Sequence, residues 1–128
     1  MNASFSFDID QARDLIRIQM AGLFGPDDIA AFLEGRRRAH TQLRCGRNRH
    51  LTLNDVRQMK IQTQEIVADF RYMLSDPAYK SRRLAFVAAP TLARGQLLRA
   101  LQERDARCFE TIEAAEAWLF AEEQSAAA

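Results

Sequence analysis

Apolar and polar residues alternate strictly at the start of the chain. The segment 4–10, SFSFDID, has an apolar residue at every second position, and the segment 16–20, IRIQM, repeats the pattern. A period of two is typical of a strand that buries one face. Because the residues between the two segments are too few for a crossover, we predict an antiparallel hairpin, closed by the turn at Gly22 to Gly25.

Four longer segments place apolar residues at the three- and four-residue spacing of a helix. The first begins at Pro26, where proline and two following aspartates suit a helix N-terminus, and we expect it to end near Gly46. The second ends before Pro77, the third opens at Thr91, and the fourth is capped by Thr111. We therefore predict four amphipathic helices that pack against a sheet.

The remaining apolar runs predict three further strands. Leu51 and Leu53 indicate a short strand, followed by a loop over residues 54–63. The run 84–89, LAFVAA, is apolar on both faces, which predicts the middle strand of the sheet, and residues 107–109 form a brief last strand. The alternation predicts an α/β fold of order β-β-α-β-α-β-α-β-α, with a mainly parallel central sheet and an antiparallel edge strand.

Length and composition indicate one domain. The chain has 128 residues, 48% of them apolar, so we expect a single domain over residues 1–124 and a disordered tail over 125–128. We see no apolar run long enough for a membrane span and no secretory signal, and we expect a cytoplasmic protein. Cys45 and Cys108 belong to no ligand motif, so we expect neither a metal nor a cofactor.

Charge is nearly balanced overall, at +1, but not along the chain. A basic cluster without acidic residues contains Arg36, Arg37, Arg38, Arg44, Arg47 and Arg49. Because no aromatic residues are interleaved with these arginines, we interpret the cluster as a solvated helix face and loop and do not expect nucleic-acid binding. Whether the cluster has another binding role stays open at this point.

The sequence predicts no catalytic residue, and we expect a protein that is not an enzyme. His40 falls within the first helix and His50 in the loop after it, and we interpret both as structural. A catalytic pair of Cys45 and His50 would lie in an irregular connection, which holds no fixed geometry. The adjacent acids Asp27 and Asp28 diverge by about 100° on a helix and do not share a proton.

Three strings carry a family resemblance: LTLNDV at the third strand, RLAFVAAPTLARGQLLRAL at the fourth strand and its helix, and FETIEAAEAWL at the end. They resemble the STAS superfamily, named for sulfate transporters and anti-sigma-factor antagonists, and in particular its bacterial SpoIIAA-like branch. The resemblance implies a regulatory or binding domain. In the antagonist members, a serine at the start of the second helix is phosphorylated by a partner kinase. Here residues 60–63 take that place without a serine, and Thr63 is the nearest hydroxyl, so we expect the switch to be lost.

The candidate binding site lies at the carboxyl ends of the parallel strands, where α/β folds place their ligands. We expect these residues to form one rim for an anion or an acidic partner segment: Asp55, Arg57, Met59, Lys60, Ile61, Thr63 and Thr91. Met59 and Ile61 have two interpretations at this stage, as core residues under the loop or as residues that face a partner or a small hydrophobic ligand.

The function predicted from this reasoning is a non-enzymatic regulatory or protein-interaction module. It docks another protein, or a second copy of itself as a homodimer, through the loop over residues 54–63. The alternative is a carrier of a small apolar ligand or lipid, because SpoIIAA-like domains also resemble the lipid-transfer CRAL-TRIO fold and helices over a sheet can enclose a cavity.

Overall fold

The computed structural model describes residues 2–100 and 106–127 and contains five strands and four α-helices in the predicted order. The elements are β1 (Ser4–Asp10), a 3-10 turn (Gln11–Arg13), β2 (Leu15–Gly22), α1 (Pro26–His40), β3 (Leu51–Met59), α2 (Gln64–Leu74), β4 (Arg83–Val87), α3 (Leu92–Ala100), β5 (Arg107–Phe109) and α4 (Ile112–Ala127). The predicted α/β order is confirmed.

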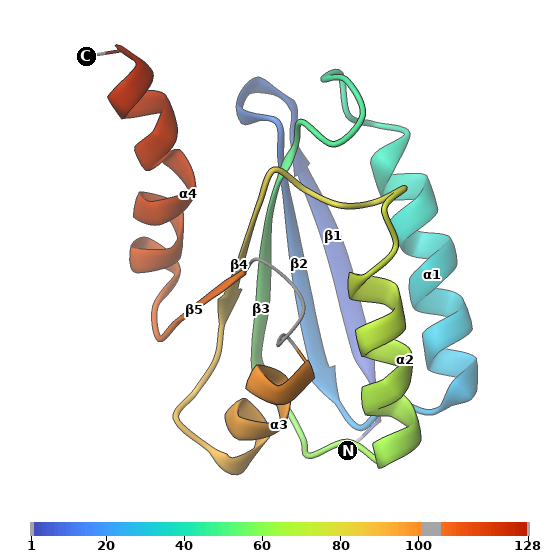
Figure 1. The fold of residues 1–128 in the computed structure, drawn as a ribbon. Helices are drawn as coiled ribbons and strands as arrows, with labels where there is room; N and C mark the ends of the chain where they lie inside the picture. The colour runs from blue at the N-terminus through green and yellow to red at the C-terminus, as the bar shows by residue number, and fades with distance from the viewer. Residues whose placement is uncertain (1, 101–105, 128) are drawn as a thin grey trace.

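The five strands form one sheet in the order β1-β2-β3-β4-β5. β1 pairs with β2 antiparallel and the other pairs are parallel, so the predicted hairpin and antiparallel edge are confirmed. The predicted turn was wrong, because residues 11–14 join the two strands and Gly22 ends β2. Because parallel crossovers are right-handed and the strands follow one another across the sheet, α1, α2 and α3 cover one face and α4 covers the other (Figure 1).

The predicted position of one strand was wrong. The segment that we expected in the middle of the sheet is β4, which lies between β3 and the edge strand β5, and the middle strand is β3. An apolar run indicates that both faces of a strand are buried. β4 meets this condition, because one of its faces packs in the core beneath α4 and the other in the core beneath α1 and α2. The apolar run does not indicate how far the strand lies from the edge of the sheet.

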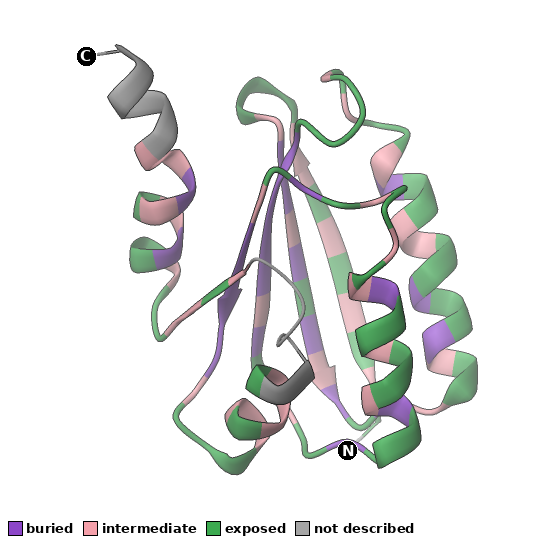
Figure 2. Ribbon diagram, in the orientation of Figure 1, coloured by how far each residue is buried: buried purple, intermediate pink, exposed green. Residues whose placement is uncertain are grey.

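Each face of the sheet has its own apolar core. The larger core joins the sheet to α1 and α2 and contains buried residues such as Ile18, Phe32 and Phe86, whereas the smaller one joins α4 to the sheet through Ala115 and Leu119. Figure 2 shows the buried residues concentrated on β2, β3 and β4, while β1 is intermediate or exposed. The β1–β2 end of the α4 face is therefore left to polar side chains.

The edge hairpin is fixed to α1 by aromatic packing. The rings of Phe5 and Phe7 lie 5.3 and 5.2 Å from the ring of Phe32 on α1. Gly35 makes this approach possible, because a Cβ atom at that position would lie 2.8 Å from the Phe7 ring. The alternating pattern of β1 thus buries one row of apolar side chains against a single helix.

The first helix is shorter than predicted. α1 ends at His40 rather than near Gly46, because the N–H groups of residues 41–43 bond to carbonyls three residues back, a tighter turn that closes the helix. α4 spans Ile112–Ala127.

The third strand is longer than predicted. β3 runs to Met59, whereas we expected a loop from Asn54. Gln58 and Met59 pair with Ala21 and Gly22 of β2 beyond an irregularity in the register, so the strand keeps its partner while its residues become polar. Only residues 60–63 connect β3 to α2.

Candidate functional site

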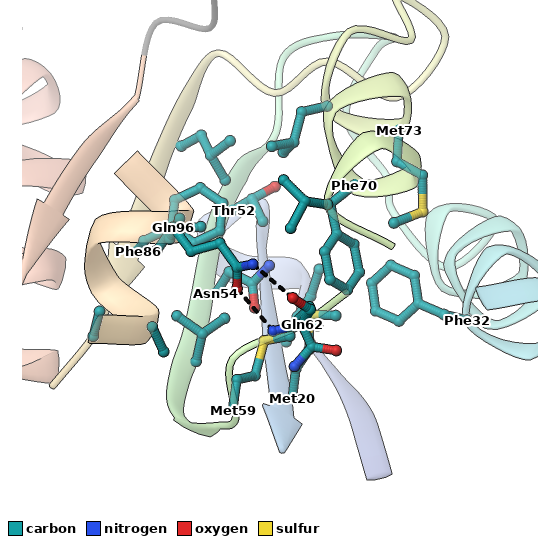
Figure 3. A pocket seen from close by; sticks show the side chains of 18 of the residues that line it. Met20, Phe32, Thr52, Asn54, Met59, Gln62, Phe70, Met73, Phe86 and Gln96 are labelled. Carbon is teal, nitrogen blue, oxygen red and sulfur yellow. Dashed lines mark hydrogen bonds between the residues drawn. The ribbon is translucent and has the colours of Figure 1, made fainter. Parts of the chain in front are cut away.

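A cavity of about 130 Å³ lies between the sheet and the helices α1, α2 and α3 (Figure 3). Most of its lining is apolar. The strands contribute Ile18, Met20, Thr52, Asn54, Val56, Met59, Leu84 and Phe86, and Ala88 follows β4 directly. The helices contribute Phe32, Arg36, His40, Val67, Phe70, Met73, Leu74, Ala93, Arg94, Gln96 and Leu97. A concave apolar site with a few polar groups is the usual form of a small-molecule site.

Strand geometry makes the cavity elongated. Alternate residues of β3, from Thr52 through Asn54 to Val56, face the helices, and the strand continues to Met59 at the other end. At about 3.3 Å per residue, Thr52 and Met59 are separated by roughly 23 Å along the strand. Ala88 and Ala93 line the carboxyl end, where their small side chains leave space.

Asn54 is the polar group in the middle of this cavity. It is 8% exposed, lies between Ile18 of β2 and Phe86 of β4, and projects among the apolar side chains (Figure 3). Its Oδ1 atom has no hydrogen-bond partner among the described residues. Leaving a buried polar group unpaired costs about 1–3 kcal/mol, and native proteins rarely do so without a reason. Asn54 is therefore the first candidate for contact with a ligand.

The carboxyl end of the cavity is closed by the connection 60–63 and α3. Gln62 is buried; its Oε1 accepts from the Phe24 N–H (2.8 Å) and its Nε2 donates to the Gly22 carbonyl (2.9 Å). Gln96 of α3 then binds the backbone of Gln62 twice: the Gln62 N–H donates to Gln96 Oε1 (2.8 Å), and Gln96 Nε2 donates to the Gln62 carbonyl (2.7 Å). Between residues 92 and 98, where the side chains of α3 are described, no residue is buried. This amide pair is consequently a main attachment of α3.

The amino end of the cavity carries a buried cation. The Arg36 side chain is 12% exposed, its guanidinium lies 4.1 Å from the centre of the Tyr79 ring, and its Nη1 donates to the Met73 carbonyl (3.1 Å). Nη2 lies 3.7 Å from Asp76, and Nε has no partner within the described part of the chain. Burial lowers the pKa of Arg36, and the charge of Asp76 opposes that shift.

Beside Arg36 the two histidines meet. His40 Nε2 lies 3.3 Å from His50 Nε2, and His40 Nδ1 lies 2.9 Å from the Arg36 carbonyl. A carbonyl can only accept, so His40 Nδ1 carries the proton and neutral His40 Nε2 accepts from His50. Burial lowers the pKa of His40, and the nearby charge of Arg36 adds to that effect. Sequence reasoning missed this pair because it placed the end of α1 too late.

The predicted rim does not form one site. Met59, Lys60 and Thr91 line the cavity at its carboxyl end. Asp55 and Arg57, which the prediction placed beside them, lie on the α4 face of the sheet, where alternate strand residues point away from the cavity. Arg57 Nε and Nη2 donate to the carboxylate of Asp55 at 2.9 and 2.8 Å. Burial opposes the ionisation of Asp55, but these hydrogen bonds outweigh it and lower the pKa.

The other predicted residues separate in the same way. Met59 packs against the core, as the first interpretation expects, whereas Ile61 is 53% exposed and is not a core residue. Thr63 is the N-cap of α2, with its hydroxyl oxygen accepting from the Ile66 N–H (3.2 Å). The hydroxyl therefore has a structural use at the start of the helix.

The basic cluster is not one surface. Arg36 points inward, contrary to the interpretation of a solvated helix face, because α1 turns that side toward Tyr79 and Met73. Arg37 and Arg38 point outward and bind Glu34 at 2.6 and 3.2 Å. Hydrogen bonds from Arg37 and then Arg38 lower the pKa of Glu34 to about 2.

No protein-family model and no curated protein matches the chain. Among solved structures, the chain is similar to the crystal structure of an uncharacterised protein of the DUF3478 family from Shewanella loihica PV-4, described as having a SpoIIAA-like fold. The TM-score is 0.68 at 12% sequence identity, over 93% of this chain and 96% of that chain. The fold is SpoIIAA-like. At this identity the likeness shows the fold alone, and it confirms the STAS resemblance at that level.

Two features are absent from residues 2–100 and 106–127. No helix there combines the length and the apolar composition that crossing a membrane requires. In the same ranges, no three His, Cys, Asp or Glu side chains gather as metal ligands would. Cys45 and Cys108 are half-buried, and burial raises the pKa of both thiols.

Proposed function

We propose that this SpoIIAA-like domain is a non-enzymatic binding module that takes a small, elongated and mainly apolar ligand into the cavity beneath α2 and α3. The observation that carries the proposal is the buried Oδ1 atom of Asn54, which has no hydrogen-bond partner among the described residues and lies in the middle of a mainly apolar cavity. By a half-turn of its amide, asparagine can offer either an acceptor or a donor to a polar group of the ligand.

Two energetic costs coincide in this cavity. An unfilled apolar cavity forfeits packing, and an unpaired amide forfeits a hydrogen bond. An apolar residue at position 54 would remove the second cost, since Ile18 and Phe86 beside it are apolar. A ligand with an apolar body and one polar group would offset both costs together, which supports binding as the use of the cavity.

The test is to identify what the protein holds in its own cells. The protein is purified without detergent, extracted with organic solvent, and the extract is analysed by mass spectrometry. Val56→Phe, which fills the cavity from β3, serves as the blocked variant, and Ile61→Asp, on the exposed connection, serves as the control. We expect a compound at the molar amount of the protein in wild type and control, and none in Val56→Phe.

The proposal fails if wild-type protein releases no such compound and also fails to bind a simple elongated probe, decan-1-ol, in a calorimetric titration. It fails equally if Val56→Phe, with an unchanged melting temperature, retains the compound. In that case the ligand would lie outside the cavity.

A second candidate is the regulatory protein-interaction module, with a second copy of the chain as partner. It is favoured by the exposed apolar residues Ile61 (53%) and Leu92 (80%), which follow β3 and β4 at the carboxyl ends of the strands. Sedimentation velocity tests it: wild type should form a dimer, and Ile61→Asp should be monomeric. A monomeric wild type at all concentrations removes this candidate and leaves the first unaffected.

A further inference from the structure

Arg36 has more hydrogen-bonding capacity than its surroundings use. Nη1 is engaged by the Met73 carbonyl, but Nε has no partner among the residues described, and Nη2 is 3.7 Å from Asp76, beyond hydrogen-bonding distance. Nε and Nη2 form one edge of the guanidinium, and that edge is the fork that binds a carboxylate with two parallel bonds. A buried cation with this edge unfilled is costly unless another group completes it.

The charges around the cavity favour an anion at this end. The cations that line it are Arg36, Lys60, Lys80 and Arg94, and Asp76 is the one carboxylate among the described lining residues. Arg94 is already paired with Glu110 at 3.2 Å. His40, beside Arg36, accepts from His50 through Nε2 in its neutral form and so adds no charge to this end. Arg36 and Lys80 thus leave the amino end with a net positive charge.

The guanidinium is also held in place. Tyr79 lies under its plane at 4.1 Å, and the bond to the Met73 carbonyl ties it to the end of α2. A fixed guanidinium loses little side-chain entropy on binding, which increases the affinity that each hydrogen bond contributes.

From these observations, and resting on the proposed function of the cavity, we propose that the ligand is an elongated carboxylic acid. Its carboxylate binds the Nε–Nη2 edge of Arg36, and a second polar group on its otherwise apolar chain pairs with Asn54. The chain continues past Val56 along β3 toward Met59 at the carboxyl end of the cavity. Asp76 holds the same edge weakly in the absence of ligand and is displaced by the ligand carboxylate.

Titration calorimetry with two probes tests the proposal. Decanoate and decan-1-ol share one chain and differ in the head group. Wild type should bind decanoate at least about tenfold more tightly than decan-1-ol, because a charge-assisted bidentate pair replaces a neutral hydrogen bond. Arg36→Met should reduce this preference to about one while changing the Kd of decan-1-ol by no more than about twofold. The matched control, Arg38→Met on the exposed side of the same helix, should keep the preference.

Because Arg36→Met also loses the bond to Met73, a second variant removes the competitor instead. Asp76→Asn leaves Arg36 in place, and it should increase the preference for decanoate by about two- to fivefold, the magnitude of a partly exposed ion pair. Thermal unfolding of every variant establishes that it is folded.

The outcomes distinguish failure of the cavity function from failure of the carboxylate assignment. If wild type binds neither probe, the cavity function and the carboxylate both fail. If wild type binds both probes equally, or if Asp76→Asn weakens decanoate, the cavity function stands and the carboxylate proposal is overturned. If the preference survives in folded Arg36→Met but is lost in Lys60→Met, the head group lies at the carboxyl end of the cavity and the assignment to Arg36 is overturned.

Discussion

Replacing Asn54 by leucine should make the protein more stable and its binding weaker. Leucine has nearly the same shape as asparagine, and the neighbours of residue 54 across the sheet are Ile18 and Phe86. The substitution removes an amide whose Oδ1 is buried without a partner in the described structure. It also places a better strand former in the middle of β3.

The expected gain follows from the cost of the unpaired group. Burying an unsatisfied polar group costs about 1–3 kcal/mol, so the free energy of unfolding of Asn54→Leu should rise by about 1–2 kcal/mol. Most substitutions of a buried residue lower stability, which makes the sign of the change informative. The affinity for decan-1-ol should fall by about two- to tenfold, the contribution of one neutral hydrogen bond.

Urea denaturation measures the gain, with an unchanged m-value as evidence that the unfolding reaction is the same. Asn48→Leu is the matched control, because the Asn48 amide donates to the carbonyls of Pro77 (2.9 Å) and Lys80 (2.7 Å) and the residue has a positive φ of 65°. That variant should lose about 1–3 kcal/mol. A loss of more than about 1 kcal/mol in Asn54→Leu would refute the reasoning, since it would mean that the amide is paired in the native protein.

Three further predictions concern other parts of the fold. Thr63→Ala should lower the free energy of unfolding by about 1 kcal/mol in urea, and Thr63→Ser, which keeps the cap, should recover most of it. Gly95→Ala should raise the melting temperature, because its Cβ meets open space in α3, whereas Gly35→Ala should lower it, because its Cβ would lie 2.8 Å from Phe7 and overpacking costs about 1–3 kcal/mol. Because the pKa of His40 is lowered in the folded protein, the unfolded chain binds more protons below pH 6.5. The free energy of unfolding should therefore be highest above the usual pKa of 6.5 and fall as the pH drops through the folded value. It should depend less on pH in His40→Gln, and an equal pH dependence of the two proteins would contradict this prediction.

Sequence patterns predicted the elements in which each face has a single environment, either the apolar core or solvent. β1 has an apolar face against α1 and a polar face toward solvent, so its alternation was sufficient. In the second half of β3, both faces carry polar residues. Asn54 faces the cavity, Asp55 and Arg57 bind each other on the opposite face, and the register shifts before Gln58. A strand with polar residues on both faces has the same sequence pattern as a loop, and a loop was therefore predicted there.

The cavity and its polar ends depend on packing that no local pattern encodes. Gln62 and Gln96 are 34 positions apart, and their hydrogen bonds exist only because α3 crosses the connection after β3. His40 and His50 meet because α1 ends at His40 and the chain returns to the start of β3. Arg36 belongs to a run of three arginines, and its inward direction follows from the helical phase relative to Tyr79.

The most direct test of the central claim is a nuclear magnetic resonance titration of methyl-labelled protein with decan-1-ol. The two cores provide an internal comparison, because Ile18, Met59 and Met73 belong to or pack against the core that holds the cavity, whereas Leu15 and Leu119 belong to the core beneath α4. We predict saturable shifts of the methyl signals of Ile18, Met59 and Met73. The methyl signals of Leu15 and Leu119 should not shift. Shifts in both cores alike, or no saturable shift at the cavity, would contradict the account.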